Sequence, residues 1–118
     1  DKIIQIPLPD KASRKSILEI NAKRIPTVKE AGDPEKVDLE KIADMTDGLS
    51  GADVASIANT AVSLVIHEYL DAHPDAKEIE KSSEKARVTM RHFEEAVKKV
   101  RDQKDLKIGQ KVVASYYR

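Results

Sequence analysis

The sequence predicts an all-α fold, a small four-helix domain preceded by a short strand-like segment. Two observations lead to this prediction. Beyond residue 10, apolar residues recur at intervals of three and four, which is the period of a helix face rather than of a strand. Polar residues of the kind that cap helix N-termini stand directly before four such stretches: Asp10, Asp38, Ser50 and Thr89.

The first nine residues, "DKIIQIPLP", form the strand-like segment. Residues 3–6 read as a short strand, which Pro7 and Pro9 stop because proline has no backbone donor for a sheet. A lone strand needs a partner, so we expect residues 1–9 to be the end of a core strand and a hinge. Residues 10–101 would then be the helical domain, and residues 102–118 a C-terminal tail.

The first helix is expected over residues 11–24, after the cap at Asp10, and Pro26 would close it. Lys23 and Arg24 would lie near its C-terminal end, where basic side chains complement the helix dipole. Four apolar residues are expected to share the buried side: Ala12, Ile17, Leu18 and Ile20.

A turn-rich loop over residues 27–37 leads to a short second helix over residues 39–46, which Gly48 ends. Ser50 then caps the longest helix, with Asp53 in the position of a capping-box acid. Its apolar positions make the clearest helical stripe in the chain: Val54, Ile57, Ala58, Ala61, Leu64 and Val65.

Residues 71–88 are polar and read as a connection. The last clear helix follows Thr89, and its stripe consists of Phe93, Ala96, Val97 and Val100. Glu94 with Lys98, and Glu95 with Lys99, have the spacing of supporting ion pairs. After Val100, apolar residues could dock as a further short helix, against which Gly109 argues: Leu106, Ile108, Val112 and Val113.

The composition excludes several classes of function. The 118 residues contain 21 basic and 21 acidic side chains, and this balance argues against a nucleic-acid binder. The absence of Cys excludes disulfides and thiolate sites, and no apolar run could span a membrane. These features, with no signal peptide at the start, suit a cytoplasmic setting.

Catalytic motifs are absent as well. The four glycines never have the spacing of a phosphate loop, and the three histidines, His67, His73 and His92, form no metal signature. We therefore expect neither a metal site nor catalytic residues in this chain taken alone.

The stretch "TDGLSGADVASIAN" has two interpretations. The structural one is that Gly48 ends a helix, Ser50 caps the next, and small Gly51 and Ala52 permit close packing. The functional one is that a ligand approaches the free N–H groups of the helix N-terminus. Spacing alone leaves both open, and the physical argument favours the structural one.

Three ordered segments of the chain resemble a known family. "IPLPDKASRKSILEINAKRIP", "VDLEKIADMTDGLSGADVASIANTAVSLVIHE" and "VTMRHFEEAVKKV" are similar to the C-terminal helical lid of AAA+ ATPases. They match the family's "P-x-x-x-x-R-x-x-I" helix, its "T-x-G-x-S-G-A-D" turn and its "HFEEA" helix. The resemblance is closest to the second ATPase module of valosin-containing-protein-like unfoldases of the archaeal type.

The resemblance implies a nucleotide-capping role. In such proteins the lid closes over the adenine of ATP or ADP, which a neighbouring α/β core holds together with Mg. It implies that four residues here approach the base and ribose: Ile17, Asn21, Gly51 and Ala52. Asp1 resembles the Asp that closes the family's "G-R-[FL]-D" turn, so the catalytic groups are expected upstream, in a parent ATPase.

The resemblance also bears on the last residues, "SYYR". Proteasome-activating ATPases end in a hydrophobic residue, a Tyr and any residue, and Tyr116, Tyr117 and Arg118 fit this pattern. It implies docking of a homohexameric ring to the core proteasome and action on unfolded protein substrates. The alternative is that the tyrosines pack back on Val112 and Val113.

Two functions therefore follow from the sequence. The first is the lid of a hexameric ATP-driven protein unfoldase. The second is a free-standing helical protein-interaction domain without nucleotide binding.

Overall fold

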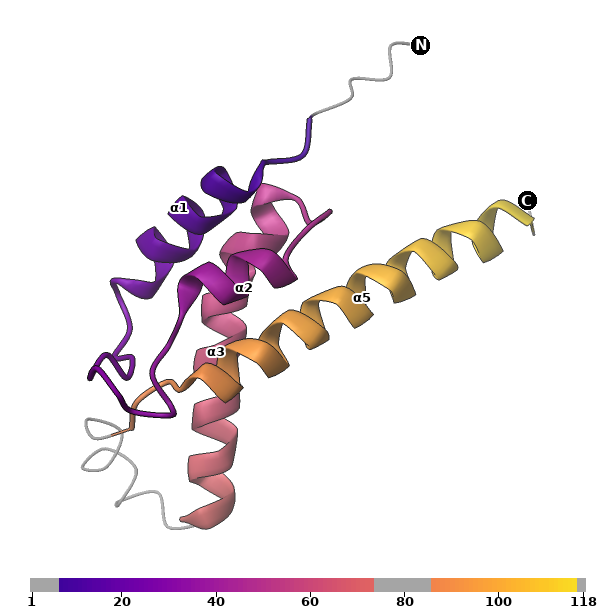
Figure 1. Ribbon diagram of the computed structural model, residues 1–118. Coiled ribbons are helices and arrows are strands. Elements are labelled where there is room, and N and C mark those ends of the chain that lie inside the picture. Colours follow the sequence, from indigo (N-terminus) through magenta and orange to yellow (C-terminus); the bar gives the residue numbers. More distant parts are fainter. Residues whose placement is uncertain (1–6, 74–85, 117–118) are drawn as a thin grey trace.

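The computed structural model describes residues 7–73 and 86–116, with only the backbone for residues 111–116 (Figure 1). The described part contains four helices and no strand, which confirms the all-α prediction. The helices are α1 (Lys11–Ala22), α2 (Leu39–Met45), α3 (Gly51–Ala72) and α5 (Met90–Tyr116). The strand-like segment at residues 3–6 lies outside the described residues.

Helix α3 is the centre of the arrangement. It packs against α1 and α5, while α2 packs against α1 and touches α5. Figure 1 shows α5 crossing this group and extending beyond it toward the C-terminus. The loop after α1 meets the chain before α5 in one isolated parallel bridge, between Thr27 and Val88.

Local side chains set the helix starts, as predicted. The Asp10 carboxylate accepts the backbone N–H of Ser13 at 2.8 Å, and the Asp38 carboxylate accepts that of Glu40 at 3.1 Å. These bonds satisfy donors that a helix N-terminus would otherwise leave without partners. The three helices that follow Asp10, Asp38 and Ser50 therefore begin where the sequence predicts.

The core consists of the apolar stripes of the four helices. The predicted stripes of α3 and α5 are confirmed in their main positions, since Val54, Ile57, Phe93 and Ala96 are fully buried. Leu64 and Val65, further along α3, are only partly buried against this core.

The predicted buried side of α1 is partly wrong. Ile20 is 60% exposed and Ala12 is exposed, whereas the buried residues of α1 are Arg14, Leu18 and Ala22. Residues four apart lie on one helix face, so the buried line follows this i, i+4 series rather than the apolar residues alone. Helix α1 also ends at Ala22, which leaves Lys23 and Arg24 just beyond it.

A buried histidine organises the start of α5. The backbone N–H of Thr89 donates to Nδ1 of His92 at 3.0 Å, so Nε2 carries the ring hydrogen and donates to Glu68 at 3.0 Å. Arg91 also binds Glu68 from α5, at 2.8 and 3.1 Å. Arg91 and then His92 lower the pKa of the Glu68 carboxyl to about 2, so Glu68 joins α3 to α5 as a carboxylate.

Helix α5 differs from its predicted extent. It continues without a break to Tyr116, where the sequence suggested an end near Val100 and a separate short helix. A glycine within a helix costs about 1 kcal/mol relative to alanine, and Gly109 stands among good helix formers that outweigh this cost. Leu106 and Ile108 are 63% and 53% exposed, and Glu95 pairs with Arg91 rather than with Lys99.

None of the helices in the two described ranges combines the length and the apolar character needed to cross a membrane.

Candidate functional site

The turn between α2 and α3 leads directly into two of the predicted site residues, Gly51 and Ala52, which begin α3. Gly48 has φ of +82°, a conformation that side-chain-bearing residues rarely adopt, and this turns the chain out of α2. Ser50 and Asp53 then form a reciprocal capping box: Ser50 N–H donates to Asp53 at 3.2 Å and Asp53 N–H to Ser50 at 3.1 Å. The predicted box is confirmed and fixes the first turn of α3.

Arg14 supports this turn from α1. Its Nε donates to the Thr46 hydroxyl at 3.0 Å, and its Nη1 and Nη2 donate to the carbonyls of Pro9 at 2.9 Å and Ala43 at 3.3 Å. The side chain is only 6% exposed. Arg14 therefore joins the segment before α1 to the end of α2. It is the Arg of the "P-x-x-x-x-R-x-x-I" motif, and the sequence reasoning gave it no role.

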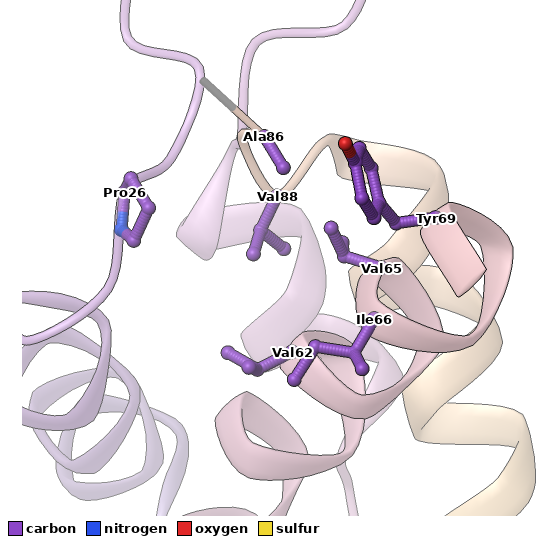
Figure 2. A pocket seen from close by; sticks show the side chains of 7 residues that line it. All are labelled: Pro26, Val62, Val65, Ile66, Tyr69, Ala86 and Val88. Atoms are coloured by element: carbon purple, nitrogen blue, oxygen red, sulfur yellow. The ribbon is translucent and has the colours of Figure 1, made fainter. Parts of the chain in front are cut away.

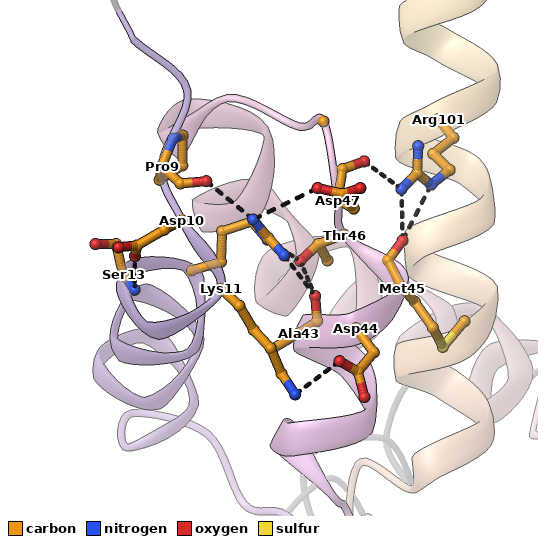
Figure 3. A network of polar contacts seen from close by, with 12 residues as sticks. Pro9, Asp10, Lys11, Ser13, Ala43, Asp44, Met45, Thr46, Asp47 and Arg101 are labelled. Atoms are coloured by element: carbon orange, nitrogen blue, oxygen red, sulfur yellow. Dashed lines mark hydrogen bonds and ion pairs between the residues drawn. The ribbon is translucent and has the colours of Figure 1, made fainter.

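Arg101 holds the same turn from α5. Figure 3 shows its guanidinium group facing the carbonyls of Met45 and Asp47, which accept its Nη2 at 2.6 and 2.7 Å. Helix C-terminal carbonyls lack partners within the helix, and Arg101 supplies one for the last residue of α2. The turn is thus held between an arginine of α1 and an arginine of α5.

The structure brings Ile17 and Gly51 together. A Cβ atom built on Gly51 would lie 3.7 Å from Cδ1 of Ile17, and both residues are partly exposed. The α1 and α3 helices are in contact here, so an object covering the Ile17 side chain would also meet the first turn of α3. The two residues form one surface, as the predicted site requires.

Asn21 lies one helical turn after Ile17 and is partly exposed. Its Nδ2 donates to the backbone carbonyl of Ile17 at 2.8 Å. The amide group therefore has a partner within α1, and its hydrogen bonding gives no separate argument for a ligand.

Ala52 is exposed and borders a hollow that Ile17 does not line. The hollow, of about 490 Å³, lies between the first turns of α3 and the middle of α5. Its rim carries two lysines, Lys104 and Lys107, together with the acid Asp53. Gly51 thus faces α1, whereas Ala52 opens toward α5.

An apolar groove lies elsewhere, along the second half of α3 (Figure 2). It measures about 190 Å³ and is lined by Pro26, Val62, Val65, Ile66, Tyr69, Ala86 and Val88. Figure 2 shows side chains of three separate segments converging on it, which explains why no single stretch of sequence predicted it. The Tyr69 ring stacks on His73, with centroids 4.4 Å apart.

The remaining predicted site residues are at the C-terminus. Tyr116 is the last residue of α5, its side chain lies outside the described part, and so do Tyr117 and Arg118. Within residues 7–73 and 86–110, no group of three or more metal-binding side chains lies close enough together to hold an ion.

Comparison with known proteins identifies the family. The family model described as "AAA+ lid domain" matches residues 36–95, which include α2, α3 and the first turns of α5. The chain is also 31% identical over 121 residues to the cell division cycle protein 48 homolog of Archaeoglobus fulgidus. That alignment covers all of this chain and 16% of the relative, so the chain spans about a sixth of the relative's length. Because the family match includes just over half of its residues, the chain belongs to the AAA+ lid domain family.

Proposed function

We propose that this chain is the C-terminal lid of a hexameric ATP-driven protein unfoldase. In this proposal an ATPase core precedes the lid in one longer protein, here called the parent ATPase, and binds ATP or ADP with Mg. The lid covers the adenine with Ile17, Asn21, Gly51 and Ala52 and relays the state of the nucleotide. The catalytic groups belong to the core.

The closeness of Ile17 to Gly51 is the observation that carries the proposal. A Cβ atom added to Gly51 would lie 3.7 Å from Cδ1 of Ile17, so the two helices named by the family motifs meet here, and both residues are partly exposed. A purine ring is flat and apolar on its faces, and such a surface suits it. Ile20, which is 60% exposed on the adjoining side of α1, extends the apolar area that another part of a longer protein would cover.

In this proposal the capping step is a rotation of the lid relative to the core. Arg14 holds the carbonyl of Pro9 and the end of α2 together, so Pro9 and the α2–α3 turn would move as one body. Ligands shift such an equilibrium only through different contacts in the two states, and here ATP and ADP would supply that difference.

Methyl resonances of isoleucine in the parent ATPase test this proposal. Adding ADP is expected to shift the Ile17 δ1-methyl signal, because an adenine ring lying against it exerts a ring-current effect. The Ile66 δ1-methyl, in the apolar groove of α3, is the internal control and should move much less. An Ile17 signal that stays in place while the core is saturated with ADP would rule out the capping role.

For the C-terminus we propose docking to the core proteasome, with unfolded proteins as substrates. Tyrosine offers rigid amphipathic surface, and the terminal carboxylate offers a charge for a basic pocket. One tail would bind weakly, whereas six tails on a ring gain from their high effective concentration.

Deleting residues 116–118 from the parent ATPase should abolish its stimulation of peptide hydrolysis by the core proteasome. ATP hydrolysis should stay close to the wild-type rate, because in this proposal the catalytic groups belong to the core and the four residues that cover the adenine are unchanged. Peptide hydrolysis and ATP hydrolysis are measured in parallel. Stimulation that survives the deletion would refute the docking proposal and leave the capping role standing.

A further inference from the structure

Two basic side chains of α5 bind the backbone of the α2–α3 turn. Arg101 donates to Met45 O through Nε at 3.1 Å and Nη2 at 2.6 Å, and to Asp47 O through Nη2 at 2.7 Å. Lys104 donates to Gly48 O at 3.0 Å. The two residues are three apart and therefore share one face of α5. Together they hold three carbonyls of the segment that leads into Gly51.

Lys104 also reaches the other end of the turn. Its Nζ lies 3.7 Å from Oδ2 of Asp53, the oxygen that accepts the Ser50 N–H in the capping box. The ammonium group therefore contacts the turn both before and after Gly51. Hydrogen bonds that involve a charged group are stronger than neutral ones, and Lys104 is about one-third exposed, which limits screening by water.

Backbone hydrogen bonds within the α2–α3 turn are not sufficient to fix its conformation. Its backbone ladder consists of two bonds, Thr46 N–H to Ala43 O and Leu49 N–H to Thr46 O, both across three residues. The carbonyls of Met45, Asp47 and Gly48 instead accept hydrogen bonds from α5, donated by Arg101 and Lys104. The position of Gly51 thus depends in part on side chains of α5, in addition to the capping box and Arg14.

We propose that Arg101 and Lys104 are positioning residues that set where Gly51 and Ala52 stand against the bound nucleotide. This inference rests on the proposed capping role and extends it. The middle of α5 becomes part of the support of the nucleotide site, although it contains none of the residues that touch the nucleotide.

The proposal has a reciprocal consequence. If the contacts of α5 change the affinity of the site for nucleotide, then bound nucleotide must change the stability of those contacts by the same free energy. Ile108 reports on this, because it borders the hollow that Ala52, Asp53 and Lys104 also line. Its δ1-methyl signal should therefore respond to ADP in the parent ATPase.

The test is the double variant R101Q/K104Q in the parent ATPase, with dissociation of methylanthraniloyl-ADP followed by stopped-flow fluorescence. Loss of these charge-assisted bonds is expected to speed dissociation about tenfold. The response of the Ile108 methyl to ADP should disappear at the same time. The variant R101K/K104R keeps donors at both positions. It should therefore dissociate ADP nearly as slowly as the wild type and keep most of the Ile108 response.

The matched control is K98Q/K99Q. It removes two charges from exposed positions one turn earlier on the same helix and should leave dissociation and the Ile108 response unchanged. If the double variant fails to fold, K104Q alone keeps the Arg101 bonds and should speed dissociation about threefold.

The outcomes separate the two proposals. Wild-type dissociation rates in folded R101Q/K104Q or K104Q, together with a normal Ile17 response to ADP, would overturn the positioning role and spare the capping role. Equal acceleration by K98Q/K99Q would also overturn it, since a general charge effect would then suffice. An Ile17 methyl that never responds to ADP, even in the wild type, would reject the capping role and the positioning role with it.

Discussion

Replacing Arg14 with methionine is expected to lower the free energy of unfolding of this chain by about 3 kcal/mol. Methionine keeps much of the apolar stem and removes all three hydrogen bonds, to Thr46, Pro9 and Ala43. The guanidinium side chain is 6% exposed, so water would replace these bonds only in part. The Ala43 carbonyl would keep its hydrogen bonds from Thr46, but the Pro9 carbonyl and the Thr46 hydroxyl oxygen would lose the Arg14 donor, which is costly away from water.

Urea denaturation of the 118-residue chain measures this effect. Arg24→Met is the matched control, because it makes the same chemical change at an exposed position just beyond α1. Surface substitutions of this kind are expected to stay within about 0.5 kcal/mol of the wild type. An Arg14→Met effect as small as that of the control would contradict the supporting role of Arg14, since burial of the charge would then offset its bonds.

The helix starts could be predicted because capping is local. Asp10, Asp38 and Ser50 lie within three residues of the groups they bind, and that spacing is visible in the sequence. The apolar stripes of α3 and α5 could be predicted as well, because helical spacing is also visible in the sequence. The buried side of α1 does not follow from its apolar residues, because it includes an arginine. Arg14 stands four residues before Leu18, and this spacing was the signal for its burial.

The contacts made by the middle of α5 could not be predicted from its own residues. Arg101 and Lys104 look like solvated charges in the sequence, and their acceptors lie 54 to 56 residues earlier in the chain. The same limit applies to the apolar groove, which Pro26, Val62 and Val88 form only once the chain is folded. The prediction that Ile17 and Gly51 belong to one nucleotide site depends on the family resemblance, because spacing alone leaves the role of the turn open.

Replacing Gly51 with glutamate is expected to weaken ADP binding by the parent ATPase about a hundredfold, or ~2.7 kcal/mol. The new carboxylate would project from the capping surface beside Ile17, where a closed lid would exclude water and leave the charge without a partner. It would also repel the phosphates of the nucleotide.

The fold should tolerate this substitution. The added Cβ meets Ile17 Cδ1 at 3.7 Å, an ordinary van der Waals contact, and Gly51 does not have a positive φ. An acidic residue in the first turn of a helix is favoured by the helix dipole. The melting temperature of the isolated chain should therefore stay the same or rise slightly, which separates a binding defect from unfolding.

Calorimetric titration of ADP into the parent ATPase tests the capping role most directly, with Gly51→Glu compared against Gly109→Glu. Gly109 is an exposed residue of α5 with no atom within 4 Å of an added Cβ, so the control carries the same change in charge and size. The capping role predicts affinity reduced about a hundredfold for Gly51→Glu and wild-type affinity for Gly109→Glu. Equal, undiminished affinity in both variants would contradict it.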